Sequence, residues 1–394
     1  MTRTVGTVAR GIRTPIVKEG DDIVSIVVDS IVEAQKSENL VLKDKDVIGI
    51  TESLIARAQG NYATTSEIAE DIKNKYPGDT IGIVFPILSR NRFSVLLKGI
   101  AESGKKLVVL LSYPSDEVGN HLMSLDTLDE LKINPYDRVL TESEYREFFG
   151  SSVKHEFTGI DYVDLYKCLG DNIEIILAND PRVILNYTKD VLVSDIHTRK
   201  RTKRLLREAG ANTVYGLDEI LNTPINGSGY NEEYGLLGSN LASDHEVKLF
   251  TRDCQKYVEE IKTKLDEIYN IETEVMVYGD GAFKDPIGKI WELADPVVSP
   301  GFTAGLKGTP NEIKLKYIAD TELSDLSPDE ALKAVTEKIY AKGTDQLSQE
   351  ESIGTTPRQI TDLLGSLCDL TSGSGDKGTP VVLVQGYFDS LAAE

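Results

Sequence analysis

The chain has 394 residues, of which 40% are hydrophobic and 27% charged, and its formal net charge is −21 at pH 7. This length and composition predict a globular protein of two or three domains. The negative charge argues against a nucleic acid or an anionic membrane as the main partner. Three scattered cysteines form no CxxC pair, and no apolar run is long enough to span a bilayer. We therefore expect a cytoplasmic protein.

The N-terminal part alternates between strand and helix patterns. Residues 1–10 predict a strand, and the loop 11–20 separates it from a helix whose apolar positions recur from Ile23 to Val32. A second strand is predicted at 46–50, and it delivers Thr51 to its carboxyl end. Polar loops thus follow both strands.

Strand and helix patterns also alternate over residues 78–225. The predicted strands are 80–85, 106–111, 173–177, 190–194 and 213–215. This alternation indicates βαβ units and a largely parallel sheet. We expect an inserted α/β domain over 78–225 and a discontinuous domain formed by 1–77 and 226–394. The predicted fold class is therefore mixed, α/β and α+β.

The last third begins with a loop-rich segment, 222–234, which marks the return from the insertion. The elements expected after it are a helix over 248–269, a strand over 274–278, helices over 328–342 and 358–370, and a strand over 381–384. A glycine-rich polar loop enters the last strand directly.

That loop contains Gly373, Ser374, Gly375 and Asp376. Glycines allow backbone N–H groups to converge where side chains would clash, and such a loop can hold phosphate oxygens. An ordinary turn has the same composition, so the loop alone does not establish a phosphate site.

Polar loops near the N-terminus could contact the same ligand. The residues concerned are Arg13, Thr14, Pro15, Ile16, Thr51, Glu52 and Arg57. Free backbone donors at helix starts suit anions, and arginines contact phosphates bidentately. A proline turn with two surface arginines is the simpler alternative, and from these residues alone it is the better one.

Asp280 lies between two glycines at the end of a predicted strand, an arrangement that suits a hard cation such as Mg²⁺. Upstream, Ser239 and Asn240 could contact a base or a ribose, and Asp244 could supply a second carboxylate. The alternatives are a glycine turn with an Asx cap at Asp280 and an irregular loop at the other positions.

Six cations occur between Arg199 and Arg207. They could dock a polyanionic substrate. We favour the simpler interpretation, a solvated helix surface, because Leu205 and Leu206 give the same helix an apolar side.

Taken in this order, the segments resemble the coenzyme F-420 gamma-glutamyl ligase family. The matching segments are 15–22, 51–60, 238–240, 277–280 and 373–386. The resemblance covers about residues 10–65 and 230–394 and leaves the α/β segment as an addition.

The resemblance implies an enzyme that uses GTP, or ATP, and Mg²⁺ or Mn²⁺ to join the amine of L-glutamate to the carboxylate of a small-molecule acid. Asp280 would hold the metal. The residues that would surround the nucleotide are Arg13, Thr14, Pro15, Ile16, Thr51, Glu52, Arg57, Ser239, Asn240, Gly373, Ser374 and Gly375. A homodimer is also implied. Because an acyl phosphate would activate the acid, such a ligase needs no protein nucleophile, and catalytic residues stay unassigned.

The chain departs from the family pattern at Leu237, where a metal-binding aspartate is usual, and at Gly281 and Ser374, where other ligands are usual. Asp244 or Asp376 could compensate. One alternative is therefore a non-catalytic nucleotide-binding or regulatory module on the same scaffold. Another places the active part in the inserted domain.

Overall fold

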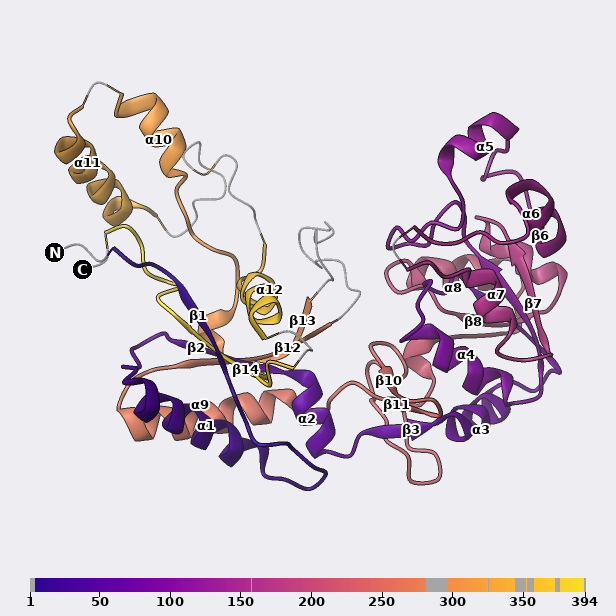
Figure 1. The fold of residues 1–394 in the computed structure, drawn as a ribbon, viewed down its shortest axis with the longest axis horizontal. Coiled ribbons are helices and arrows are strands. Elements are labelled where there is room, and N and C mark those ends of the chain that lie inside the picture. Colours follow the sequence, from indigo (N-terminus) through magenta and orange to yellow (C-terminus); the bar gives the residue numbers. More distant parts are fainter. Residues whose placement is uncertain are drawn as a thin grey trace. The chain divides into compact units, whose positions relative to one another are not determined.

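The structure is a computed structural model. It describes residues 4–156, 158–280, 297–324, 326–343, 352, 358–372 and 376–392, with the backbone alone at Asp280, Val297 and Val298. The chain forms two units, drawn in Figure 1: residues 1–58 with 253–394, and residues 59–252.

These borders differ from the positions 77/78 and 225/226 expected from the sequence. The second unit also includes residues 59–77 and 226–252, because hydrogen bonds join these two segments to each other. β3 (Tyr62–Thr64) pairs antiparallel with β11 (Glu246–Lys248), and the Asn61 amide donates to the carbonyl of Phe250 at 2.7 Å.

The first unit contains a sheet with the strand order β1-β14-β2-β12-β13. β14 pairs antiparallel with β1 and β2, whereas β2 and β12 are parallel. The strands are β1 (Val8–Ile12), β2 (Val47–Thr51), β12 (Glu274–Asp280), β13 (Val297–Phe302) and β14 (Val381–Gln385). The helices are α1 (Ile23–Glu38), α2 (Glu52–Ala58), α9 (Cys254–Tyr269), α10 (Leu315–Glu322), α11 (Pro328–Ala341) and α12 (Ile360–Ser372), with the 3-10 helix η3 (Ala304–Leu306).

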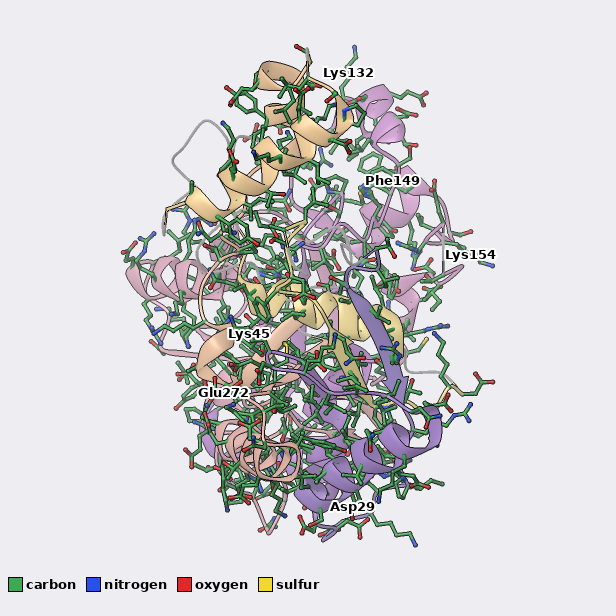
Figure 2. The ribbon with its side chains drawn as sticks, turned by 90° about the vertical axis from the view of Figure 1, so that its left-hand side faces the viewer. Asp29, Lys45, Lys132, Phe149, Lys154 and Glu272 are labelled. Carbon is green, nitrogen blue, oxygen red and sulfur yellow. The ribbon has the colours of Figure 1, made fainter. Side chains whose placement is uncertain are left out.

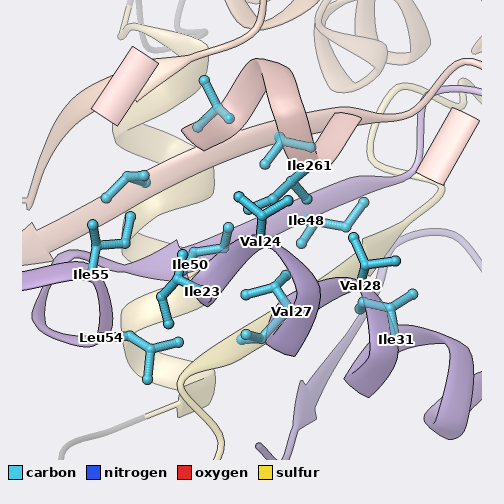
Figure 3. Close-up of a cluster of buried hydrophobic side chains, with 14 of the residues drawn as sticks. Ile23, Val24, Val27, Val28, Ile31, Ile48, Ile50, Leu54, Ile55 and Ile261 are labelled. Atoms are coloured by element: carbon cyan, nitrogen blue, oxygen red, sulfur yellow. The ribbon is translucent and has the colours of Figure 1, made fainter. Parts of the chain in front are cut away.

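Helices cover both faces of this sheet, with α1 and α9 on one side and α12 on the other (Figure 1). Figure 3 shows the apolar side chains of α1 that meet Ile48 and Ile50 of β2. Because side chains alternate along a strand, Gly49 faces α12 instead. A Cβ at Gly49 would lie 2.5 Å from the Cys368 Sγ, so a larger residue would push α12 away.

Backbone bonds tie the chain entering β2 to the chain entering β12. The Lys45 N–H donates to the Glu272 carbonyl at 2.7 Å, and the two residues lie beside each other in Figure 2. In return, the Glu272 N–H donates to the Asp44 carboxylate at 2.9 Å. These bonds hold the two parallel strands in register at the edge where they begin.

The second unit contains a larger sheet with the order β6-β7-β5-β4-β8-β9 and a small sheet with the order β10-β11-β3. Besides β3 and β11, its strands are β4 (Thr80–Val84), β5 (Lys106–Leu111), β6 (Leu140–Thr141), β7 (Ile173–Leu177), β8 (Asp190–Val193), β9 (Thr213–Gly216) and β10 (Asn240–Ser243). Its helices are α3 (Thr65–Lys75), α4 (Phe93–Ala101), α5 (Leu125–Leu131), α6 (Glu142–Phe149), α7 (Tyr162–Lys167) and α8 (Arg199–Glu208), with the 3-10 helices η1 (Pro181–Asn186) and η2 (Leu217–Glu219).

All neighbours in the larger sheet are parallel except β6, which pairs antiparallel with β7. Leu206 of α8 and Ile184 of η1 pack on the face that carries Val191 and Val193. The parallel βαβ arrangement predicted for this region is confirmed, and so is the mixed fold class.

Two predicted elements were wrong at their start. The strand expected over residues 1–10 is β1, which begins at Val8 and runs to Ile12. The helix expected over 248–269 begins at Cys254, because Lys248 still belongs to β11 and Asp253 adopts a left-handed φ of 58°. Among the described helices, none is both long and apolar enough to cross a membrane.

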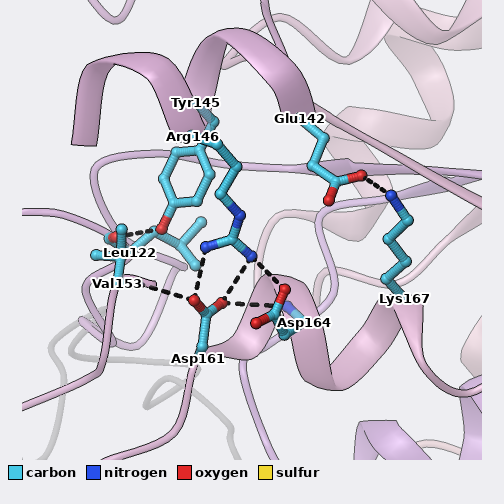
Figure 4. A network of polar contacts seen from close by, with 8 residues as sticks. All are labelled: Leu122, Glu142, Tyr145, Arg146, Val153, Asp161, Asp164 and Lys167. Carbon is cyan, nitrogen blue, oxygen red and sulfur yellow. Dashed lines mark hydrogen bonds and ion pairs between the residues drawn. The ribbon is translucent and has the colours of Figure 1, made fainter. Parts of the chain in front are cut away.

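A polar network fixes the outer part of the second unit (Figure 4). Arg146 of α6 bonds the Asp161 carboxylate at 2.6 and 3.1 Å and Asp164 at 2.6 Å, while the Val153 N–H donates to Asp161 at 2.8 Å. Burial alone would raise the pKa of Asp161, but these hydrogen bonds and that of the Asp164 N–H outweigh it and lower the pKa.

Ile50 is fully buried between β14 and β12. Replacing Ile50 with Ala should lower the free energy of unfolding by about 2–5 kcal/mol, because it leaves a cavity in the sheet core. Denaturant titration followed by circular dichroism measures the change, and Val41→Ala at an exposed position is the control. Equal effects of the two substitutions would contradict this account of the core.

Replacing Asp161 with Asn should cost about 1–3 kcal/mol at pH 7, because the charged pairing with Arg146 is lost. Since the folded pKa lies below the ordinary value of 3.8, the stabilisation is present above that value and is lost as the pH falls through the folded pKa. The difference between wild type and variant should therefore shrink below about pH 4 in unfolding titrations. A constant difference down to pH 2 would contradict this, and Glu174→Gln in the exposed pair with Lys106 is the matched control.

Candidate functional site

A cavity of about 930 Å³ in the first unit joins residues from the two ends of the chain. Arg13, Thr14 and Pro15 line it from the loop after β1. Thr371 from the last turn of α12 and Lys377 and Thr379 from the loop before β14 line it as well. The N-terminal loop and the flanks of the glycine-rich loop therefore border one space.

Strand pairing brings these walls together. β1 and β14 are antiparallel, with Ile12 opposite Val381 and Gly11 opposite Val382. A Cβ at Gly11 would lie only 2.8 Å from the Thr379 Cβ, so the absence of a side chain permits this approach. The loop after β1 and the loop before β14 therefore lie at the same end of these two strands, and the strand pairing fixes where both loops begin.

The cavity lining carries charges of both signs. Arg13 and Lys377 make no ion pair with another described residue, whereas the Arg10 guanidinium donates to the Gln385 side chain at 2.7 Å. Glu33 and Glu38, both from α1, line the cavity as well. Two cations are thus available to an anionic ligand on the side formed by the loops, and carboxylates lie on the helix side.

Thr51 and Glu52 lie close to the C-terminal strand, at the start of α2. The Thr51 N–H donates to the Pro380 carbonyl at 3.0 Å, next to Thr379 of the cavity wall. Glu52 is buried, and a Cβ at Gly279 would lie 2.3 Å from its Cγ. A carboxylate side chain therefore packs over the strand that leads to Asp280.

α12 is anchored to the same strand. The Tyr278 hydroxyl donates to the Ser372 Oγ at 2.7 Å, and Tyr278 lies opposite Thr51 in the parallel pairing. The residue before the glycine-rich loop is thereby fixed beside the ends of β2 and β12.

Other predicted site residues lie elsewhere. Ile16 is 81% exposed, Arg57 is exposed on α2, and neither lines the cavity. Asp376 is described and exposed. Gly373, Ser374, Gly375 and Gly281 lie outside the described residues, as does the side chain of Asp280.

Ser239, Asn240 and Asp244 belong to the second unit. Ser239 is buried and donates to the Leu236 carbonyl at 2.7 Å, and Asn240 pairs with Lys248 in β10 and β11. Asp244 is exposed, and its carbonyl accepts from Lys98 at 2.8 Å. Each of them is thus explained by local structure in its own unit.

The described residues include no group of three or more His, Cys, Asp or Glu side chains placed to hold a metal ion. Leu237, at the position of the family's metal-binding aspartate, is buried. Glu52 is the buried carboxylate that packs against the strand leading to Asp280.

Among the cavity residues that sequence reasoning missed are Glu33, Glu38, Lys377 and Thr379. Lys377 and Thr379 lie within the glycine-rich stretch that was singled out, so the stretch itself was the signal. The sequence pattern of α1 does not distinguish Glu33 and Glu38 from ordinary solvent-exposed glutamates on a helix.

Comparison with known proteins came to the same family as the motifs. A model of the family described as F420-0:Gamma-glutamyl ligase matches residues 11–386, a range that includes the segment treated above as an insertion. No curated protein matches the chain. The match covers nearly the whole sequence, and the chain therefore belongs to the F420-0:gamma-glutamyl ligase family.

Proposed function

We propose that the protein is a nucleotide- and divalent-metal-dependent gamma-glutamyl ligase that joins L-glutamate to the carboxylate of a small-molecule acid. One observation carries the proposal beyond family membership: the loop containing Arg13 and the loop containing Lys377 line a single cavity. The nucleotide, GTP or ATP, would bind there with its phosphates against these cations.

The reaction would run in two balanced steps. The γ-phosphoryl group moves from the nucleotide to the carboxylate of the acid, which gives an acyl phosphate and a nucleoside diphosphate. The glutamate amine then attacks the acyl carbon, the C–N bond forms, the C–O bond to phosphate breaks, and the amine loses a proton. The protein contributes mainly positioning and charge neutralisation in such transfers.

The cavity residues would contact the nucleotide phosphates in two ways, through charge and through hydrogen bonds. Arg13 and Lys377 would neutralise phosphate charge, and the Thr14 and Thr379 hydroxyls would bond phosphate oxygens. The remaining predicted contacts in the first unit, which are proposed on the family resemblance, are Pro15, Ile16, Thr51, Glu52, Arg57, Gly373, Ser374 and Gly375.

Asp280 is the proposed ligand of Mg²⁺ or Mn²⁺, with Glu52 beside its strand and with Asp376 as a further candidate from the same unit. A bound cation would neutralise charge on the nucleotide phosphates. A homodimer is proposed on the same resemblance.

A second function is favoured by one observation, the buried Leu237 at the family's metal-binding position. It is a nucleotide-binding or regulatory module without catalysis. Phosphate release that requires both L-glutamate and a candidate acid would exclude the module. Nucleotide binding without such release would support it.

Replacing Arg13 or Lys377 with Ala should weaken GTP or ATP binding in the presence of Mg²⁺ by about tenfold or more, because each removes a charged hydrogen bond to phosphate. Isothermal titration of the full chain measures the affinity, and Lys316→Ala at an exposed position of the same unit is the control. Unchanged affinity in both variants would place the nucleotide elsewhere. In the same titrations, metal-dependent binding that survives Asp280→Ala would remove Asp280 from its proposed role.

A further inference from the structure

The larger sheet of the second unit has a topological switch point between β4 and β8. The chain passes from β4 to β5 and β7 on one side and then returns to β8 and β9 on the other side of β4. In open parallel sheets of this kind, ligands bind outside the carboxyl ends of the strands at the switch point. The residues that follow β8 there are Ser194, Asp195, Ile196 and His197.

Two of these residues bury polar atoms without a protein partner. Ser194 is 1% exposed and Asp195 is 2% exposed, and neither the Ser194 Oγ nor the Asp195 Oδ1 is hydrogen-bonded to a described residue. The other carboxylate oxygen of Asp195 accepts from Thr198 at 2.5 Å and from Thr202 at 2.8 Å. Leaving buried polar atoms unpaired is unfavourable, so these atoms call for a partner from outside the chain.

A side chain from a neighbouring loop already lies at this place. The Glu117 carboxyl, from the segment after β5, accepts hydrogen bonds from the backbone N–H groups of Ile196 and His197, the latter at 3.1 Å. These N–H groups immediately precede α8. Thr198 is the N-cap residue of this helix, and its side chain makes no hydrogen bond to the backbone N–H groups of the first turn. Together with the positive end of α8 they form a site suited to an oxyanion.

Glu117 also resembles an acid that keeps its proton. Burial, together with the charges of Asp195 and Asp116, raises the pKa of Glu117 to about 7, although the two N–H bonds oppose this rise. Near neutral pH the Glu117 carboxyl is therefore protonated in a substantial fraction of molecules. When the Glu117 carboxyl is protonated, it repels the Asp195 carboxylate less than an ionised Glu117 would.

We propose that this place in the second unit is a binding site for monoprotonated phosphate, free or as a monoester, and that the phosphate takes the position of the Glu117 carboxyl. Its oxygens would accept from the Ile196 and His197 N–H groups and from the Ser194 hydroxyl. Its own P–OH would donate to the Asp195 Oδ1. The Ser194 Oγ and the Asp195 Oδ1 would then each have a partner of the matching kind.

One nearby cation, Arg199, offsets part of the charge. The Arg199 guanidinium donates to the Ile196 carbonyl at 2.5 Å and lies 3.4 Å from the Asp218 carboxylate. All groups named belong to residues 59–252, so the site is separate from the cavity proposed for the nucleotide.

The proposal predicts discrimination between two ions of the same shape. Sulfate carries no proton near neutral pH, so it cannot donate to Asp195, and the two negative charges repel. Phosphate should bind and sulfate should not. Hydrogen phosphate carries the required P–OH group near neutral pH, whereas a phosphate monoester, whose second pKa is about 6, must take up a proton to supply it.

The test is isothermal titration of the full chain at neutral pH with inorganic phosphate, phenyl phosphate and sulfate as probes. Glu117→Ala should bind phosphate at least about tenfold more tightly than wild type, because the competing carboxyl is gone, and should still reject sulfate. Glu147→Ala, at an exposed position of the same unit, should behave as wild type. Tight binding of inorganic phosphate alone would identify free phosphate, and tighter binding of phenyl phosphate would identify a phosphorylated molecule.

Two further variants keep the test decisive if Glu117→Ala does not fold. Ser194→Ala should weaken phosphate binding about tenfold, and Asp195→Asn should admit sulfate, because the new amide donates where the carboxylate only accepts. Phosphate binding that is lost in Lys377→Ala but kept in Ser194→Ala would assign it to the first unit and overturn the proposal. Equal binding of phosphate and sulfate by the chain carrying Asp195 would overturn it as well.

Discussion

The insertion of β14 between β1 and β2 is the constraint on which the first unit depends. Gln385 at the end of β14 accepts from Arg10 of β1 at 2.7 Å and donates to the Asp46 carboxylate before β2 at 2.6 Å. Burial raises the pKa of Asp46, while the bond from Gln385 and a backbone bond from Lys43 partly offset that rise. The last strand of the chain thus completes a core that the first fifty residues cannot close alone.

The pairing of β1 with β14 also explains why a cavity can form between the loop after β1 and the loop before β14. Loops that carry ligand-binding residues work when a rigid scaffold holds them. The loop with Arg13 leaves β1, and the loop with Lys377 enters β14, so hydrogen-bonded neighbouring strands fix both cations. Neither loop could be placed by local sequence preferences, since about 360 residues separate them in the chain.

Much of the fold could be predicted from the sequence, because long apolar strands and periodic helices show their own pattern. The parallel arrangement around β4 and the apolar strand after the glycine-rich loop are examples. The start of α9 was predicted too early, because charged residues near Lys248 suit a helix as well as a short strand, and the pairing of β11 with β10 and β3 decides. The site was partly predictable: Arg13 belonged to a recognisable motif, whereas Glu33 depends on how α1 packs. Glu117 and Ile196 carry no motif, and the fold of the sheet brings the segments after β5 and β8 together.

Hydrogen exchange of the full chain, measured with and without GTP and Mg²⁺, tests most directly whether the two chain ends form one nucleotide site. The account predicts slower exchange on nucleotide addition in both residues 10–14 and residues 376–382, because one ligand would contact both loops. Protection confined to one of these segments, or to residues 59–252, would contradict it.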